Sequence, residues 1–420
     1  FTADDGGGDS DSDGDTDSDT DGDTDTGEDE IPPDLPASCT ADSVNLAVSG
    51  AGDGRWPTAA GGAGGILLAW AYDEQQEQAD WDIQVSTCQS GIPPVIGPPQ
   101  EPIAAATLSE KPDMAARGEV FGLAWLDTRW DADCQAANQD ACQRDLAFIE
   151  LTAAGQPAND AEPTRLTTGQ NPNGRPVVAA TPSGWIVAWS QSQGSTSSSI
   201  KALAVDGEGQ PGAVHAISDD GAAAPELSPA LAAVGDQLLI VWLAVDRTAV
   251  FSRVIGADGA PQGQPLSVVE GSLCTRPGLT AGSGGFLLTY GRSKGADLEI
   301  RALRLDTAGV PIGDEQRVTW TSTDTTTAVP AWSGSEWAVA WLSDRANGAS
   351  ECQVASCQPQ VFLTVLGADG APRAREVWLS EDQNFAAELD LAWDGIGWLG
   401  VFELWRNLRK QIHWGHAFCD

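Results

Sequence analysis

Four basic side chains occupy the same place in a repeated sequence pattern, and together they could bind an anion. Each lies one or two residues before the Pro that opens a short apolar segment, and they are Arg55, Lys111, Arg175 and Arg276. Acidic residues outnumber basic ones by 61 to 22 in this chain, so four cations at equivalent positions are unusual. Arginine binds carboxylate or sulfate groups through two parallel hydrogen bonds. The pattern therefore predicts a site for a carboxylate, a sulfate or an acidic sugar.

Acidic residues in the same repeats offer a structural alternative for these cations. Asp127, Asp246 and Asp344 each follow an apolar strand and are expected on the same side of the repeats. Ion pairs between them and the basic residues would join neighbouring repeats, which is a common use of surface charge. An anion site and structural ion pairing both remain open at this point.

Other patterns that indicate catalysis are scarce. The sequence contains no HExxH motif and no phosphate-binding loop. His413 and His416 are three residues apart on an expected strand, so their side chains point to opposite faces and do not predict a metal site. Carboxylate pairs for glycoside hydrolysis assemble in space rather than in sequence, so they stay an alternative. Trp81, Trp130 and Trp405 lie outside the repeat pattern and offer faces for stacking on sugars.

Seven copies of a strand pair must position these residues. The copy at residues 175–189, RPVVAATPSGWIVAW, has a Pro-led strand, a turn, and a strand of alternating large side chains. The second strand of every copy ends in an aromatic residue, and successive aromatic residues are 48 to 64 positions apart. These residues are Trp70, Trp125, Trp189, Trp242, Tyr290, Trp341 and Phe402.

Two more strands complete each copy. A turn of the form D-x-x-G-x-P follows the third strand, as at Asp206 to Pro211, because Gly tolerates positive φ and Pro begins an extended segment. Four antiparallel strands in a unit of about 50 residues are typical of a propeller blade. The predicted fold is all-β, a seven-bladed β-propeller over residues 38–420. Its blades are expected at about 55–110, 111–173, 174–226, 227–275, 276–327, 328–386, and 387–420 completed by 43–49.

The two ends of the chain are expected to meet in the last blade. The seventh copy stops after its third strand, and residues 43–49 resemble the missing fourth strand. Aligning Val48-Ser49 with Leu379-Ser380 places Cys39 beside Cys419. We therefore predict a disulfide between these two cysteines, which would close almost the whole chain into a loop.

Two long loops between second and third strands each carry a further pair of cysteines. We predict local disulfides Cys134–Cys142 and Cys352–Cys357, while the state of Cys88 and Cys274 stays open. Stiffened loops on one face indicate a recognition surface or protection against proteolysis, and both interpretations remain. Eight cysteines without a CxxC pair favour an oxidising compartment over a metal site.

The first 37 residues differ in composition from the rest. Residues 1–30 contain 14 acidic side chains and no Lys or Arg, so we expect a disordered acidic stalk, with residues 31–36 (IPPDLP) as a stiff spacer. Asp17, Asp19, Asp21 and Glu28 match the D-x-D-x-D-G-x5-E pattern of a Ca²⁺ loop, the one metal candidate. Clustered Ser and Thr residues are candidates for O-glycans.

Charge and hydropathy limit the partners. A net charge of −39 disfavours nucleic acid and anionic membranes. No apolar run approaches 18 residues, so no transmembrane segment is expected. The chain begins at Phe1 rather than Met, from which we expect that an export signal has been removed.

With its repeats and acidic Ser/Thr/Asp/Gly stalk, residues 38–420 resemble bacterial extracellular β-propeller proteins, especially surface lipoproteins. This resemblance implies a location outside the cell or on the bacterial surface, with outer-membrane anchoring as one form. The SxDxGxTW boxes of sialidases are absent, so no functional residues are transferred. A mature lipoprotein would begin with Cys, and this chain begins with Phe1.

Three functions are compatible with these observations. The first is a non-enzymatic surface propeller that binds a protein or glycan through its loop-rich face. The second is a carbohydrate-active enzyme, a glycoside hydrolase or lyase, at the channel mouth. The third is a subunit of an extracellular assembly or fibril, in which the stalk or residues 43–49 engage a neighbouring copy.

Overall fold

The computed structural model divides the chain into residues 1–33 and residues 34–420, and the residues it describes lie in the second part. The candidate calcium ligands Asp17, Asp19, Asp21 and Glu28 lie outside the described residues, as do Cys274, Cys352 and Cys357. The described residues are 35, 37–42, 47–74, 81–103, 108–134, 142–169, 174–192, 197–219, 222–223, 229–271, 275–282, 284–294, 297–320, 325–344, 359–380, 385–406 and 409–419.

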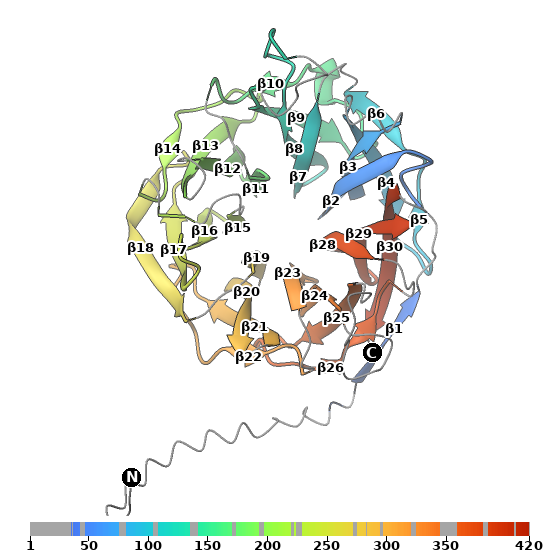
Figure 1. Cartoon of the computed structure of the whole chain (residues 1–420), viewed down its shortest axis with the longest axis vertical. Coiled ribbons are helices and arrows are strands. Elements are labelled where there is room, and N and C mark those ends of the chain that lie inside the picture. Colours follow the sequence, from blue (N-terminus) through green and yellow to red (C-terminus); the bar gives the residue numbers. More distant parts are fainter. Residues whose placement is uncertain are drawn as a thin grey trace, which may run out of the picture. The chain divides into compact units, whose positions relative to one another are not determined.

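The described residues form seven sheets arranged around a central axis (Figure 1), antiparallel except for one short parallel pair in blade 7, which confirms the predicted seven-bladed propeller. From blade 1 to blade 7, the inner strands are β2 (Asp53–Gly62), β7 (Ser109–Arg117), β11 (Val177–Thr181), β15 (Ala230–Val234), β19 (Gly278–Gly282), β23 (Thr325–Trp332) and β28 (Ala386–Trp393). The second strands are β3 (Gly65–Asp73), β8 (Val120–Asp127), β12 (Gly184–Ser192), β16 (Gln237–Leu243), β20 (Gly285–Lys294), β24 (Trp337–Ser343) and β29 (Trp398–Arg406).

The two outer positions complete each sheet. The third strands are β4 (Asp82–Gln89), β9 (Asp145–Thr152), β13 (Ser198–Asp206), β17 (Ala249–Ile255), β21 (Asp297–Leu305), β25 (Gln360–Leu366) and β30 (Arg409–Cys419). The fourth strands are β5 (Val95–Ile96), β10 (Thr164–Arg165), β14 (His215–Ala216), β18 (Pro261–Glu270), β22 (Gln316–Arg317), β27 (Val377–Trp378) and β1 (Ala37–Asp42). β6 (Gln100–Ile103) also pairs with β4, β26 (Ala374–Arg375) with β1, and a short 3-10 turn spans Ala158–Asp160.

The core lies between neighbouring blades, where second strands are covered on both faces. Their terminal aromatic residues, from Trp70 to Phe402, are at most 2% exposed, as expected for strands that read as continuous apolar runs. Glycine permits the closest approach between blades. A Cβ on Gly122 of β8 would lie 2.6 Å from the Trp185 indole of the next blade. The repeated apolar pattern therefore buries each blade against its two neighbours.

Ring closure uses a different strand from the predicted one. β1 pairs antiparallel with β30, with Cys39 opposite Cys419, and a disulfide joins these two residues. The strand described here is Ala37–Asp42, whereas the prediction used residues 43–49, of which 43–46 lie outside the described residues. Val48 also contacts β30, because its N–H donates to the Ile412 carbonyl at 2.7 Å. The strand pairs within its own chain.

A hydroxyl at the end of the fourth strand recurs around the propeller. Ser49 accepts a hydrogen bond from the Ile412 N–H at 3.0 Å, as Ser380 does from the Val361 N–H at 3.1 Å. Equivalent bonds involve Thr167, Ser218 and Thr319. These hydroxyls satisfy an N–H that the short fourth strand leaves unpaired, and they support the alignment of Val48-Ser49 with Leu379-Ser380.

The up-and-down order of the strands puts the loops between second and third strands on one face, together with the connections from blade to blade. This surface is called the loop-rich face below. The loop at residues 128–144, which contains one disulfide, belongs to it. Within the described ranges, no helix has the length and apolar character needed to cross a bilayer.

Candidate functional site

A cavity of about 140 Å³ lies in the central channel, and inner strands from six of the seven blades contribute to its wall. Its charged lining residues are Asp113, Arg175, Arg276 and Asp390, from blades 2, 3, 5 and 7. The remaining lining residues are apolar, among them the opening residues Pro229 and Pro277. Two of the four basic residues identified from the sequence thus line one cavity. We call these four charged residues the channel cluster.

Arg276 is the cation of the channel cluster without a direct partner. Among the described residues, none forms a hydrogen bond with its guanidinium or an ion pair within 4.0 Å of it. Burial lowers the pKa of Arg276, Glu388 nearby opposes this shift, and the charge of Arg175 adds to it. A half-buried guanidinium without a partner among the described residues can bind an anionic ligand.

Arg175 links the inner strands of blades 1 and 2 through hydrogen bonds. Its Nε donates to the Pro112 carbonyl at 2.8 Å, and its Nη2 donates to the Pro57 carbonyl at 2.7 Å. Only 7% of the residue is exposed, and its Nε is 3.8 Å from Asp113 Oδ1. Arg175 therefore has a structural role at the cavity wall and adds positive charge beside Arg276.

The two aspartates of the channel cluster have equivalent places in blades 2 and 7. Asp113 Oδ2 accepts the Val178 N–H at 2.8 Å, and Asp390 Oδ2 accepts the Ala59 N–H and the Thr58 hydroxyl, both at 2.9 Å. Each carboxylate thus joins its inner strand to that of the next blade. Burial raises the pKa of Asp113 to about 7; Arg175 counteracts the shift, while Asp390 increases it.

The other two predicted cations lie away from the channel cluster. The Arg55 guanidinium is 4.8 Å from the centre of the Trp81 ring and 5.9 Å from that of Trp56, and its nearest carboxylate is Asp53 at 3.9 Å. Lys111 is half-buried at the start of β7, with a positive φ of 54°. Of the four predicted basic residues, Arg175 and Arg276 therefore line the channel cavity, and Arg55 and Lys111 do not.

The aspartates expected to neutralise these cations pair elsewhere. Asp127 is buried and accepts the Trp125 Nε1–H at 2.6 Å, and it forms an ion pair with Arg129 at 2.8 Å. Asp246 accepts hydrogen bonds from Thr248 in its own loop. For these two aspartates the predicted blade-to-blade pairing was wrong, because their side chains turn back onto their own loops. Asp113 and Asp390 occupy the place beside the arginines instead.

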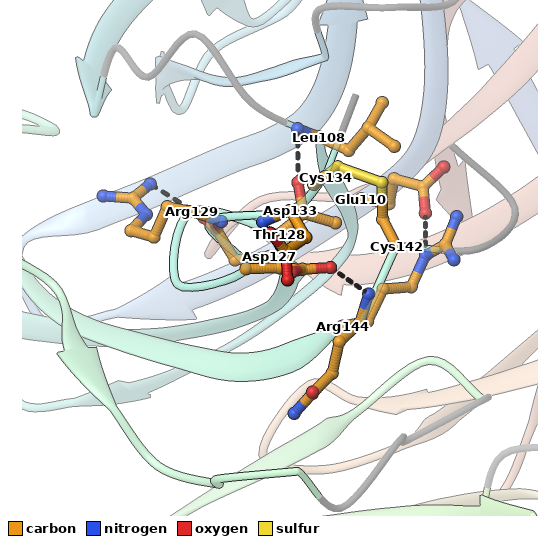
Figure 2. Close-up of a disulfide and its surroundings, with 11 residues drawn as sticks. Leu108, Glu110, Asp127, Thr128, Arg129, Asp133, Cys134, Cys142 and Arg144 are labelled. Carbon is orange, nitrogen blue, oxygen red and sulfur yellow. Dashed lines mark hydrogen bonds and ion pairs between the residues drawn. A yellow bond between two sulfur atoms is a disulfide. The ribbon is translucent and has the colours of Figure 1, made fainter. Parts of the chain in front are cut away.

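The disulfide-containing loop of blade 2 is anchored at several points (Figure 2). The Cys134–Cys142 disulfide closes it, and Arg144 Nε contacts Glu110 Oε2 at 3.0 Å. The Leu108 N–H donates to the Thr128 hydroxyl at 3.0 Å. These contacts tie the loop to the segment that enters β7, which carries Lys111 and Asp113. The described parts of the loop, residues 128–134 and 142–144, are therefore held against this segment.

The tryptophans outside the repeat pattern differ in accessibility. Trp81 is only 3% exposed, so its predicted use as a sugar-stacking face was wrong: its ring packs between Trp56 and the blade core. Trp130 is half-buried, with Arg129 and Arg165 at 5.6 and 5.5 Å from its ring centre. Trp405 is 44% exposed.

Sequence analysis missed Glu403, a fully buried carboxylate at the loop-rich end of blade 7. It accepts the Trp56 N–H at 2.8 Å and pairs with Lys410 at 3.0 Å. Burial raises the pKa of Glu403, and Lys410 opposes the shift. The sequence signal for Glu403 was a single acidic residue within the apolar strand WLGVFELW. Asp113 and Asp390 had a comparable signal, because each is a charged residue directly after the residue that opens an apolar segment.

The opposite end of the channel contains a second cavity of about 440 Å³. Trp332 and Trp393, which end the inner strands of blades 6 and 7, line it together with glycines of the β2–β3 hairpin. Asp394 is among the lining residues of this cavity and pairs with buried His416 at 3.2 Å.

Cys88 is a buried free thiol. Burial raises the pKa of this thiol to about 12, which makes it unreactive near neutral pH.

Comparisons with known proteins found similar structures but no relative by sequence. No family model matches the sequence, and no curated protein matches it. The hemagglutinin-neuraminidase ectodomain of parainfluenza virus 5 is similar in structure, with a TM-score of 0.50 and 10% identity over 91% of this chain and 86% of that one. A Trypanosoma rangeli sialidase mutant with trans-sialidase activity has a TM-score of 0.48 and 10% identity over 91% of this chain.

This chain spans 59% of the length of the trypanosomal sialidase. The α-L-arabinanase of Penicillium chrysogenum, solved with arabinobiose, has a TM-score of 0.43 and 12% identity over 74% of this chain and 93% of that one. Identities of 10 to 12% show similarity of fold alone. By structure, the chain is a seven-bladed β-propeller, similar in fold to the hemagglutinin-neuraminidase ectodomain of parainfluenza virus 5.

Proposed function

We propose that this protein is an extracellular propeller that binds an acidic glycan at the channel cluster, on its loop-rich face. The observation that carries the proposal is Arg276, a half-buried guanidinium at the cavity wall without a hydrogen-bond or ion-pair partner among the described residues. A carboxylate of a uronic or sialic acid type would complete its hydrogen bonds in the bidentate geometry that guanidinium favours. Asp390 would accept hydrogen bonds from sugar hydroxyls.

The surroundings of the channel cluster support a ligand larger than a simple ion. Trp56 and Arg55 lie at the start of β2, and the Cys134–Cys142 disulfide lies in the loop between β8 and β9. Half-buried aromatic and cationic side chains on the same face as a polar cavity suit carbohydrate recognition, which combines stacking with hydrogen bonds. The disulfides agree with an oxidising compartment outside the cell. Display on a bacterial surface, held by the acidic stalk, is part of this proposal.

We expect Arg276→Gln to weaken binding of the acidic glycan selected on an array by about 10- to 100-fold, the usual range for losing a charge-assisted hydrogen-bond pair. The readout is the dissociation constant by calorimetry for the purified full chain. Arg247→Gln is the matched control, because Arg247 is an exposed arginine on the loop-rich face outside the cavity. Equal losses in both variants, or none in Arg276→Gln, would overturn the proposed site.

Binding should also depend on pH. Asp113 is neutral below its pKa of about 7, so the two arginines then exceed the ionised carboxylates of the cavity. When pH rises through 7, Asp113 gains a negative charge beside the anionic ligand, and affinity should fall. Asp113→Asn should remove this dependence and keep affinity at pH 8 close to its value at pH 6. Titration at both pH values checks the sign: stronger binding of the parent protein at pH 8 would contradict it.

A further inference from the structure

The second cavity, at the end of the channel opposite the channel cluster, contains a departure from the repeat that the fold does not require. In every blade, one inner-strand residue is paired with the large apolar residue near the start of the second strand. From blade 1 to blade 7, these inner-strand residues are Gly61, Ala116, Ala180, Ala233, Ala281, Trp332 and Trp393. Five blades thus use Gly or Ala at this position. Because a small residue is sufficient for blade packing, the two tryptophans need another explanation.

The two tryptophans come from neighbouring blades and line the same cavity. Their strands, β23 and β28, lie side by side at the central axis (Figure 1). The ring centre of Trp332 is 4.3 Å from that of Trp337, and the ring centre of Trp393 is 4.8 Å from that of Trp398. These two partners are at most 2% exposed, whereas Trp332 and Trp393 are half-buried. Each indole is therefore supported by the core and leaves part of its surface to the cavity.

The rest of the wall leaves room for a ligand and offers it polar groups. Gly61, Gly62 and Gly65 of blade 1 line the cavity without side chains, and its volume of about 440 Å³ lies in the range of about 300–1,000 Å³ that is typical of small-molecule sites. The Thr280 hydroxyl of blade 5 forms no hydrogen bond with another described residue. The indole N–H groups of the two tryptophans likewise have no acceptor within the described ranges. All three groups can bind a ligand.

The cavity presents no free charge. Asp394 is the one ionisable side chain among its described lining residues, and it is only 7% exposed. Its Oδ1 accepts the N–H groups of Ile396 and Gly397, both at 2.7 Å. Its Oδ2 is buried and lies 3.2 Å from His416 Nε2. Since groups of the protein surround both carboxylate oxygens, the cavity suits a neutral ligand, in contrast to the channel cluster.

We propose that the second cavity binds a neutral sugar ring of a glycan, at a site separate from the channel cluster. The C–H groups on the apolar face of a pyranose are attracted to the electron-rich face of an indole, so the ring stacks on Trp332 or Trp393. Its hydroxyls bind the Thr280 hydroxyl and the indole N–H groups. No cation lines the cavity, so the carboxylate of an acidic sugar would lose its hydration there without gaining a partner. This site does not depend on the proposed binding of an acidic glycan.

The test measures binding of cellotetraose, xylotetraose, mannotetraose and β-1,4-galactotetraose to the purified full chain by calorimetry. The parent protein is expected to bind at least one of them. Trp332→Ala and Trp393→Ala should each weaken that binding by about 10-fold, because each removes one stacking face. Both changes introduce the residue that blades 2 to 5 carry at this position, so the variants should fold. Thr280→Val should weaken binding by about 3- to 10-fold through the loss of one hydrogen bond.

Trp320→Ala is the matched control, because Trp320 is half-buried but lines neither cavity. Its affinity for the neutral sugar should stay within twofold of the parent value. Arg276→Gln should also bind the neutral sugar as the parent does, and Trp332→Ala should retain binding of the acidic glycan. The two sites can therefore fail separately.

Three results would overturn the neutral-sugar site. The first is that none of the four oligosaccharides binds. The second is that the tryptophan variants bind within twofold of the parent, or, where these do not fold, that Thr280→Val does. The third is binding of tetramethylammonium that the tryptophan variants lose, without any sugar binding, which would assign the two indoles to a cation instead.

Discussion

Replacing both ring-closing cysteines, Cys39→Ser with Cys419→Ser, is expected to lower the free energy of unfolding by about 2–5 kcal/mol. The disulfide joins residues 380 positions apart, so its loss returns the largest loop-closure entropy in the chain to the unfolded state. β1 is otherwise held to β30 by four residue pairs and to β26 by two. Guanidinium denaturation followed by tryptophan fluorescence measures the change.

The matched control is the second disulfide. Cys134→Ser with Cys142→Ser opens a loop of separation 8, for which chain entropy predicts a smaller loss. A larger destabilisation from this pair than from Cys39 and Cys419 would show that ring closure depends on the strand ladder rather than on the covalent link.

Trp189→Ala should destabilise the protein by about 3–5 kcal/mol, because a fully buried indole would be replaced by a cavity. Trp189 ends β12, and its ring packs in the apolar cluster between blades 2 and 3. The equivalent aromatic residues of the other blades are buried in the same way, so the effect should recur at Trp125 and Trp341. The midpoint of thermal unfolding by circular dichroism is the measurement.

Trp405→Ala provides the contrast, since 44% of that residue is exposed at the end of β29. It should change stability by less than about 1 kcal/mol. Similar losses for Trp405 and Trp189 would mean that burial between blades does not dominate the stability of the propeller.

Local sequence patterns were sufficient to predict the blades. A period of two within strands and an aromatic residue at the end of each second strand specify which faces are buried, and Pro and Gly mark the turns. The same patterns paired Cys39 with Cys419, since two cysteines at the ends of complementary strands must meet when a ring closes. The register of the last strand was less certain, because only Val48 and Ser49 carry the repeated end-of-strand signature.

The channel cluster depended on tertiary structure. Sequence placed Arg175 and Arg276 at equivalent positions, but equivalent positions do not guarantee equivalent side-chain directions. Arg175 donates to two proline carbonyls, whereas Arg55, beside a register shift in β2, stacks on Trp81. Asp113 and Asp390 are 277 positions apart in the printed sequence and approach only when the ring closes.

The sequence by itself determined the repeat, the number of blades, the cysteine pair at the junction and the residue types around the channel, since each follows from local periodicity. The tertiary structure decided which charges share a cavity, which are satisfied by backbone groups, and that Arg276 has no direct partner among the described residues. Electrostatic energy depends on burial and on distances between residues from different blades, and strand periodicity specifies neither.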